Sequence, residues 1–500
     1  MQNTLENNSG HLLIKSKFFI FRAVSYFSFL LIPLYVQKSL DLHPGLQALF
    51  MCVYILFVVA QWFLLGKEID HRLKIYFRVN SSIDRIIYRI FLGLFFFVIL
   101  FNMISLFPSK WIYNSFWVTW SLLGLFYSWP TRGKIIQESV SSNFGEFRFL
   151  DGFEKTLVAF IVIMFIVSLP DYPPLMGSEA MKLFYDPLEK VAGPIWNFIT
   201  VNYYPFKSYP ILNRAAWSLH FYVVNMGLFL LLFYAFLRYF VSRRLSLLGV
   251  FSLVSTWSFT KIFVHNIEFG ILTTFSLLWV WTTLWVSKSS TYRAGLFLGL
   301  VGYWGTLINQ AFAPLMWIQI LLMYFVYLKD RTYWFRNQFL RYASFGFFLS
   351  LVVLLNHLEP FFGGMLKGNN IWSLFWFEVN RKAFFSLSIF GFIIFLMIYY
   401  KKKINLFREA NFDRDYLEIF WTSFAICVVY SVLIDPHIFK GFALIWPMAF
   451  LSLIPIEVLF QSISRLRSKR NMIFLIYILI CLLDSHFEGR VKIFLKIFNN

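Results

Sequence analysis

Long apolar runs separated by short polar stretches repeat along the whole chain. A helix that crosses the hydrocarbon layer of a membrane needs about 20 mostly apolar residues, and most of these runs approach or reach that length. Backbone amides cannot stay unpaired in lipid, so the runs are expected to form helices rather than strands. The pattern predicts an all-α, polytopic transmembrane helical bundle with about 15 spans (roughly 13 to 16). The spans are expected at 18–37, 45–65, 89–107, 111–129, 155–169, 215–237, 245–261, 268–286, 294–309, 312–328, 342–357, 383–400, 416–434, 441–460 and 472–484.

Lysine and arginine are concentrated in every second polar loop. If the N-terminus is cytoplasmic, about 30 of the 45 Lys and Arg fall in inside loops and about 14 in outside loops, as the positive-inside rule expects. One missed helix would invert the pattern downstream, so the alternation supports both the helix count and the orientation. Inside loops are expected at 67–89, 132–155, 238–244, 288–293, 329–341, 401–414 and 465–470.

Composition agrees with a membrane protein and excludes several functions. Apolar residues make up 59% of the chain and charged residues 14%, whereas a soluble domain is about half apolar and a quarter charged. The net charge of +20 lies in short loops, so nucleic acid is not an expected partner and membrane lipid is. The three cysteines are dispersed in apolar runs, and no P-loop, GxGxxG or HExxH motif occurs. The first apolar run is long enough to be a retained helix rather than a cleaved signal.

The polar loop at 170–214 is the strongest candidate for chemistry, because apolar runs flank it and it carries several carboxylates. Three prolines at its start prevent a continuous helix, and Ser178 is placed to cap a new helix at about 179–190. Carboxylates held among aromatic rings at a membrane surface are partly desolvated and become better bases. The competing interpretation is that these are solvated acids beside interfacial aromatic residues. The candidate acids are Asp171, Glu179 and Asp186.

Two further outside segments carry polar candidates. His265 and Glu268 lie in a short turn, where they would bind substrate or a metal ion or simply flank a helix start. Gln310 lies where two expected spans meet, and it would either line a cavity or belong to a simple turn. In the loop at 359–382, Lys367 and Arg381 are placed to hold a phosphate or to flank membrane ends. No metal site is defined, although a divalent cation is compatible with these acids.

The stretch from about 155 to 315 resembles the core of the C-type (GT-C) polytopic glycosyltransferases. This group contains the dolichyl-phosphate-mannose protein mannosyltransferases and the bacterial lipid A aminoarabinose transferases. The resemblance is carried by the "SEA" element at 178–180 in the first outside loop, and by "NRAAWSLHFYVVNMGLFLLLFYAFLRYFVSRRLSLLG", "KIFVHNIEFGILTTFSLLWVWTTL" and "STYRAGLFLGLVGYWGTLINQAFAPL" after it. The chain differs from many members in having Ser178 rather than an acid before Glu179, and Gln310 rather than a lysine. Four spans also precede the core.

The resemblance implies an enzyme of the bacterial inner (plasma) membrane that uses a sugar carried on polyprenyl phosphate. In that family an acid of the first outside loop deprotonates the acceptor hydroxyl, which implies Glu179 as the catalytic base and Asp171 as the second candidate. The acid of the second outside turn corresponds to Glu268. The chain is accordingly expected to divide into a four-span block at 1–150 and a GT-C-like core at 151–500.

Two alternatives remain open at this stage. A transporter or flippase of a lipid-linked or amphiphilic substrate needs no covalent chemistry, but such proteins usually show repeat symmetry and ionisable residues near mid-span. A membrane-bound O-acyltransferase would use a buried histidine such as His220 or His357. The sugar, the acceptor and any protein partner are not specified by the sequence.

Overall fold

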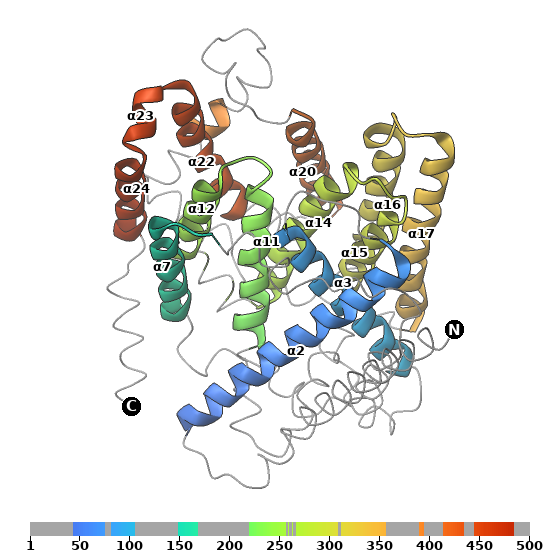
Figure 1. The fold of residues 1–500 in the computed structure, drawn as a ribbon. Helices are drawn as coiled ribbons and strands as arrows, with labels where there is room; N and C mark the ends of the chain where they lie inside the picture. The colour runs from blue at the N-terminus through green and yellow to red at the C-terminus, as the bar shows by residue number, and fades with distance from the viewer. Residues whose placement is uncertain are drawn as a thin grey trace, which may run out of the picture. The chain divides into compact units, whose positions relative to one another are not determined.

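The computed structural model describes residues 44–75, 82–105, 149–168, 220–256, 259, 263, 267–308, 312–356, 390–394, 414–434 and 445–484. These residues are helices and short turns, and no strand occurs among them, which confirms an all-α fold for this part of the chain (Figure 1). The elements are α2 (Pro44–Leu73), α3 (Ser82–Ser105), α7 (Gly152–Ser168), η3 (His220–Met226), α11 (Gly227–Leu237), α12 (Arg243–Ser255), α14 (Ile267–Ser287), α15 (Ala294–Ile308), α16 (Phe312–Leu322), η5 (Met323–Tyr327), α17 (Tyr333–Asn356), α20 (Arg414–Ile434), α22 (Ile445–Ser462), α23 (Ser464–Ser468) and α24 (Arg470–Asp484).

Helices α2, α3 and α17 extend beyond the apolar runs that predicted them. α2 continues to Leu73 and α3 begins at Ser82, so the loop between them is shorter than the one expected at 67–89. α17 begins at Tyr333, where the Thr332 hydroxyl accepts a hydrogen bond from the Phe335 backbone N–H. An N-cap and an acid in the first turn stabilise helix starts whatever the hydropathy of the turn, so the helices include polar turns that an apolar pattern leaves out.

The chain divides by its contacts into two units. Of the described elements, the first unit holds α2 and the part of α3 from Tyr88 onward. The second holds the start of α3, up to Ile87, and every described element from α7 onward. The polar cluster at the start of α7 lies in the second unit.

In the first unit, α2 and α3 pack closely at two glycines. A methyl group at Gly66 would overlap the Arg89 carbonyl oxygen, and one at Gly93 would overlap the Trp62 carbonyl oxygen. The Arg89 guanidinium donates to Asp70 with both Nε and Nη2 at 3.2 Å, and both side chains are almost completely buried. Because a buried charge is costly without a partner, this pair fixes the register of the two helices.

Helix α14 is the central helix of the second unit. It packs against α11, α15 and α20, and every residue of its Gly270–Ser287 segment is buried. Among the described residues this is the one helix long and apolar enough to cross a membrane by length and composition. The described residues also include shorter apolar helices, at Val223–Leu237, Ala294–Ile308, Leu315–Tyr327, Trp446–Phe460 and Arg470–Leu482.

Helices α15 and α17 cross at small residues. The sequence Gly295-Leu-Phe-Leu-Gly299 places two glycines one turn apart on α15, facing Ala343 and Gly346 of α17. A methyl group at Gly295 would lie 2.5 Å from the Phe339 carbonyl oxygen, and one at Gly299 would overlap the Ala343 carbonyl oxygen. This GxxxG arrangement lets two backbones approach closely, as in many membrane-helix pairs.

Large apolar side chains cover the outward faces of several peripheral helices. A soluble protein rarely exposes so many contiguous apolar side chains, because each loses favourable burial free energy. The exposed residues of α7 are Phe160, Val162, Ile163 and Ile166. Those of α16, η5 and α17 are Ile318, Leu321, Phe325, Val326, Phe345 and Phe348. Those of α24 are Met472, Leu475, Ile476 and Leu479.

Candidate functional site

Of the residues predicted to act on substrate, one falls in the described part of the chain. Glu268 lies in the first turn of α14, as expected for an acid leading into a span, and the structure describes its backbone position only. The other candidates lie outside the described residues, namely Asp171, Glu179, Asp186, His265, Gln310, Lys367 and Arg381. Of the two histidines considered for acyl transfer, His220 begins η3 without a described side chain and His357 lies outside the described residues.

The turns that follow Glu268 contact the segment that follows the 170–214 loop. Asn225 on η3 accepts a hydrogen bond at 2.8 Å from the Thr274 hydroxyl of α14. A methyl group at Gly270 would lie 3.2 Å from the Asn225 amide nitrogen. The first described helical segment after that loop, η3, is therefore packed beside the start of α14. The π-helical geometry of η3 is notable here, because such turns occur frequently at functional sites.

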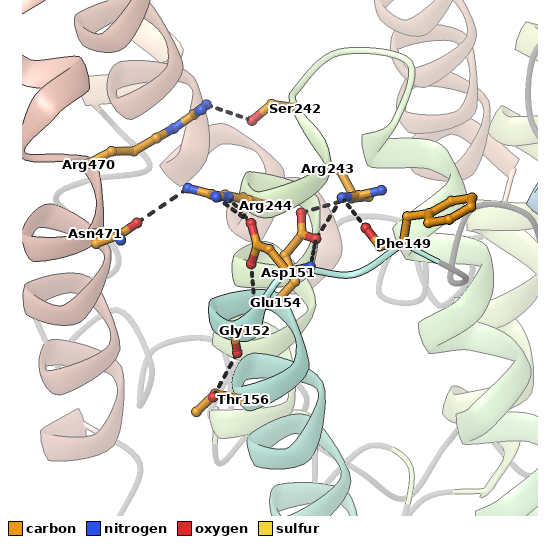
Figure 2. Close-up of polar contacts among 10 residues, drawn as sticks. All are labelled: Phe149, Asp151, Gly152, Glu154, Thr156, Ser242, Arg243, Arg244, Arg470 and Asn471. Carbon is orange, nitrogen blue, oxygen red and sulfur yellow. Dashed lines mark hydrogen bonds and ion pairs between the residues drawn. The ribbon is translucent and has the colours of Figure 1, made fainter.

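The best-defined polar cluster in the described residues lies at the start of α7 (Figure 2). Asp151 and Glu154 form a reciprocal capping box. The Glu154 N–H donates to the Asp151 carboxylate at 2.8 Å, and the Asp151 N–H donates to the Glu154 carboxylate at 3.0 Å. These bonds satisfy two backbone donors that a helix start leaves unpaired, and the two negative charges suit the positive end of the helix dipole.

Two arginines at the start of α12 pair with these two acids. The Arg243 guanidinium donates to Glu154 from Nε at 2.8 Å and from Nη2 at 2.7 Å, and Nη2 also donates to the Phe149 carbonyl oxygen at 3.1 Å. Arg244 donates to Asp151 from Nε at 2.9 Å and also from Nη2. The paired, fork-like geometry fixes how α12 begins relative to α7.

The start of α24 joins the same cluster, as Figure 2 shows. Arg244 donates to the Asn471 side-chain oxygen at 3.3 Å, and Arg470 donates to the Ser242 hydroxyl at 3.1 Å. The Arg470 guanidinium also lies over the rings of Phe460 and Phe474, at 5.2 and 5.7 Å from their centroids. Three helix starts from distant parts of the sequence thus meet in one ionic cluster.

The electrostatics of this cluster keep Asp151 ionised. The hydrogen bond from the Glu154 backbone lowers the pKa of the Asp151 carboxyl below its ordinary value, and the Arg244 guanidinium lowers it further. Desolvation acts in the opposite direction and is outweighed. A carboxylate held ionised by two arginines is a poor general base at neutral pH. The cluster is therefore a clamp between helices rather than a proton-transfer site.

Polar contacts also join helix ends at other loops that the charge pattern placed inside. The Asp84 carboxylate accepts hydrogen bonds from the Trp281 indole N–H at 3.1 Å and from the Tyr239 hydroxyl at 3.3 Å. The Tyr239 ring lies edge-on to Tyr416, over which the Lys288 ammonium sits at 5.2 Å. Segments far apart in sequence but predicted on one membrane face are thereby brought together.

The described residues contain no group of three or more His, Cys, Asp or Glu side chains placed to hold a metal ion. Of the two residues considered for a divalent cation, Glu268 is described by its backbone only and His265 lies outside the described residues, so the cation is a hypothesis from the sequence. The capping box and the arginine pair were not identified from the sequence. The sequence nevertheless contains a recognisable capping pattern, because Asp151-Gly-Phe-Glu154 comes directly before an apolar run. Arg243-Arg244 likewise comes before an apolar run.

Comparison with known proteins adds no further assignment: no family model matches the chain, and no curated protein or solved structure matches it.

Proposed function

We propose that the chain is a polytopic membrane glycosyltransferase with a cytoplasmic N-terminus. It transfers a sugar from a polyprenyl-phosphate donor to a lipid, glycan or protein acceptor on the non-cytoplasmic face of the bacterial inner membrane. The proposal combines the sequence resemblance to GT-C enzymes with the arrangement of the described helices.

The membrane assignment is supported by the outward faces of the second unit. The exposed faces of α7, α17 and α24 are apolar, whereas ionic contacts occur at helix ends. Lipid is the solvent that would cover such faces without cost. The close glycine crossing of α15 and α17 is also typical of helix pairs in a bilayer, where backbones pack through small residues.

The observation that carries the proposal is the direction in which α14 runs relative to the predicted inside segments. The indole of Trp281, in the second half of the helix, donates a hydrogen bond to Asp84, which belongs to a predicted inside segment, whereas Glu268 lies in the first turn. Trp281 lies 13 positions after Glu268, which corresponds to about 20 Å of helix. Glu268 therefore belongs to the end of α14 remote from Trp281, and the charge pattern predicts that end on the same membrane face as the 170–214 loop.

The proposed reaction uses acids of the outside loops. Glu179, or Asp171, accepts the proton of the acceptor hydroxyl while the oxygen of that hydroxyl forms a bond to the anomeric carbon of the sugar. The bond between that carbon and the phosphate oxygen breaks, and polyprenyl phosphate leaves. Lys367 or Arg381 would stabilise the charge on the departing phosphate. Glu268 and His265 would position substrate or a divalent cation, with Asp186 and Gln310 contributing further polar contacts.

Single substitutions in the full-length protein test this assignment. Glu179→Gln and Asp171→Asn should each be made, and transfer from a radiolabelled polyprenyl-phosphate sugar measured in membranes. At least one variant should lose 100-fold or more of the activity, since general-base catalysis contributes roughly 10²–10⁴-fold. Glu189→Gln, in the same loop, is the matched control and should remain active. Full activity in both variants would remove the proposed base, and donor movement across the membrane without a glycosidic product would favour a flippase.

A further inference from the structure

The turn before α17 and the first turns of that helix form a strongly basic surface. Residues 329–341 contain Lys329, Arg331, Arg336 and Arg341 and one acid, Asp330. The Arg331 guanidinium donates to the Ser289 carbonyl oxygen at 3.2 Å, which attaches this segment to the turn before α15. That turn adds Lys288 and Arg293. We call the residues 288–293 and 329–342 the α17 basic surface.

Exposed aromatic side chains accompany these cations. Tyr333 is 68% exposed and Trp334 is 60% exposed, so neither is part of the packed core. The Trp334 ring nevertheless has a fixed place, because it lies edge-on to Tyr292 with centroids 5.3 Å apart. Large rings with one polar atom, standing exposed beside cations, are typical of the level of a bilayer where head groups meet hydrocarbon.

Several arginines of the surface are oriented by aromatic rings. Arg331 lies over Phe335 at 5.6 Å and Arg293 over Tyr292 at 5.8 Å. Arg336 lies over Tyr324 at 5.2 Å, and the Tyr324 hydroxyl is itself fixed by a 2.8 Å hydrogen bond to Asn337. Cation–π contacts of this kind hold the guanidinium groups of Arg331 and Arg336 in place without neutralising their charge. The surface therefore presents positive charges in fixed positions, with a single acid in residues 329–341.

We propose that the α17 basic surface binds the phosphate groups of anionic phospholipids in the cytoplasmic leaflet. The inference rests on the membrane placement given under Proposed function, and not on the sugar-transfer reaction. Guanidinium and ammonium groups complement phosphate oxygens, and a cluster of cations beside a membrane helix end attracts anionic lipid. The exposed rings of Tyr333 and Trp334 then lie at the level of the same head groups, which places lipid rather than a soluble anion against the surface.

Lipid retention by the full-length protein tests the inference. The protein is incubated in mild detergent with phosphatidylglycerol or with phosphatidylcholine of identical acyl chains, and the bound lipid is counted by native mass spectrometry. The test variant is Lys329→Gln with Arg341→Gln, because both side chains are exposed and neither is part of the ring contacts described above. The variant should need on the order of tenfold more phosphatidylglycerol for equal retention, with retention of phosphatidylcholine unchanged.

The matched control is Arg465→Gln with Lys469→Gln, which removes two exposed cations from α23 and the turn after it. It should retain phosphatidylglycerol like the unmodified protein. An equal loss in both variants, or no preference of the unmodified protein for phosphatidylglycerol, would overturn the inference.

Alkaline carbonate extraction of cell membranes, done first, separates the two proposals. A chain released into the aqueous phase contradicts the membrane assignment, whereas an integrated chain without lipid preference contradicts the α17 surface alone.

Discussion

Glu154 is a nearly buried carboxylate that accepts hydrogen bonds from two nitrogens of Arg243 and from the Asp151 backbone. We expect Glu154→Gln to destabilise the protein by about 2 kcal/mol, because hydrogen bonds to charged groups contribute roughly 1.5–3 kcal/mol. The apparent melting temperature in detergent measures this loss. Lys155→Gln, an exposed change at the next residue of α7, is the control and should stay within about 0.5 kcal/mol of the parent. Equal melting temperatures of all three proteins would contradict the clamp.

Asp151 gives the clamp a defined pH dependence. Its pKa in the folded protein is lowered, chiefly by the Glu154 backbone hydrogen bond, so the folded state binds this proton less readily than the unfolded state. The stabilisation is therefore complete above the ordinary carboxyl pKa and is lost as pH falls through the lowered folded value. We expect the difference in melting temperature between the parent and Asp151→Asn to be constant above about pH 5 and to shrink on further acidification. A difference that grows on acidification would contradict the sign of the shift.

At the level of helices, the crossing of α15 and α17 depends on residues without side chains. Gly299→Ala places a methyl group against the Ala343 carbonyl oxygen, so the helices must separate. We expect a loss of about 1–3 kcal/mol, the usual cost of overpacking, measured as thermal stability in detergent. Gly227→Ala is the control, since a methyl group there meets nothing within 4 Å. A Gly299→Ala protein as stable as the Gly227→Ala protein would show that the crossing is not tight.

Within the described residues, helix positions were largely predictable from the sequence, and helix ends were not. The run at 268–286 differs from α14 by one residue at each end, because polar residues lie close to both ends, with Asn266 before it and Ser287 and Lys288 after it. The run at 342–357 missed the first turns of α17, since Tyr333 and Trp334 stand beside cations and a Thr332 cap begins the helix. Hydropathy reports burial in lipid, whereas hydrogen bonds at the termini decide where a helix begins.

For the molecule as a whole, the charge alternation predicts which loops share a membrane face. Single cysteines placed at Ser290, Ser468 and Ser178 in a chain lacking its native cysteines test the orientation. Ser290→Cys and Ser468→Cys should react with a membrane-impermeant maleimide only after the cells are opened, and Ser178→Cys should react in intact cells. Labelling of Ser468→Cys in intact cells would reverse the proposed orientation and place Glu179 on the wrong face for the reaction.

The candidate site was predictable only to the level of which loops carry it. The acids stood out because polar loops are rare in so apolar a chain, and Glu268 does open a helix as expected. The contact between Asn225 and Thr274 could not be predicted, since it joins residues 49 positions apart that a hydropathy pattern treats as interior. Asp84 was overlooked for the opposite reason, because an acid in a basic loop resembles an ordinary solvated charge until Trp281 and Tyr239 are seen to enclose it.

The ionic cluster at the start of α7 also bears on the order in which the chain is assembled. The ribosome delivers Asp151 and Glu154 first, Arg243 and Arg244 about 90 residues later, and Arg470 and Asn471 only near the end of synthesis. The acids can therefore pair with arginines midway through translation, but the contacts of α24 form only near the end of synthesis. A chain that stops before residue 470 keeps the pairs between α7 and α12 and lacks α24 together with its contacts to Arg244 and Ser242.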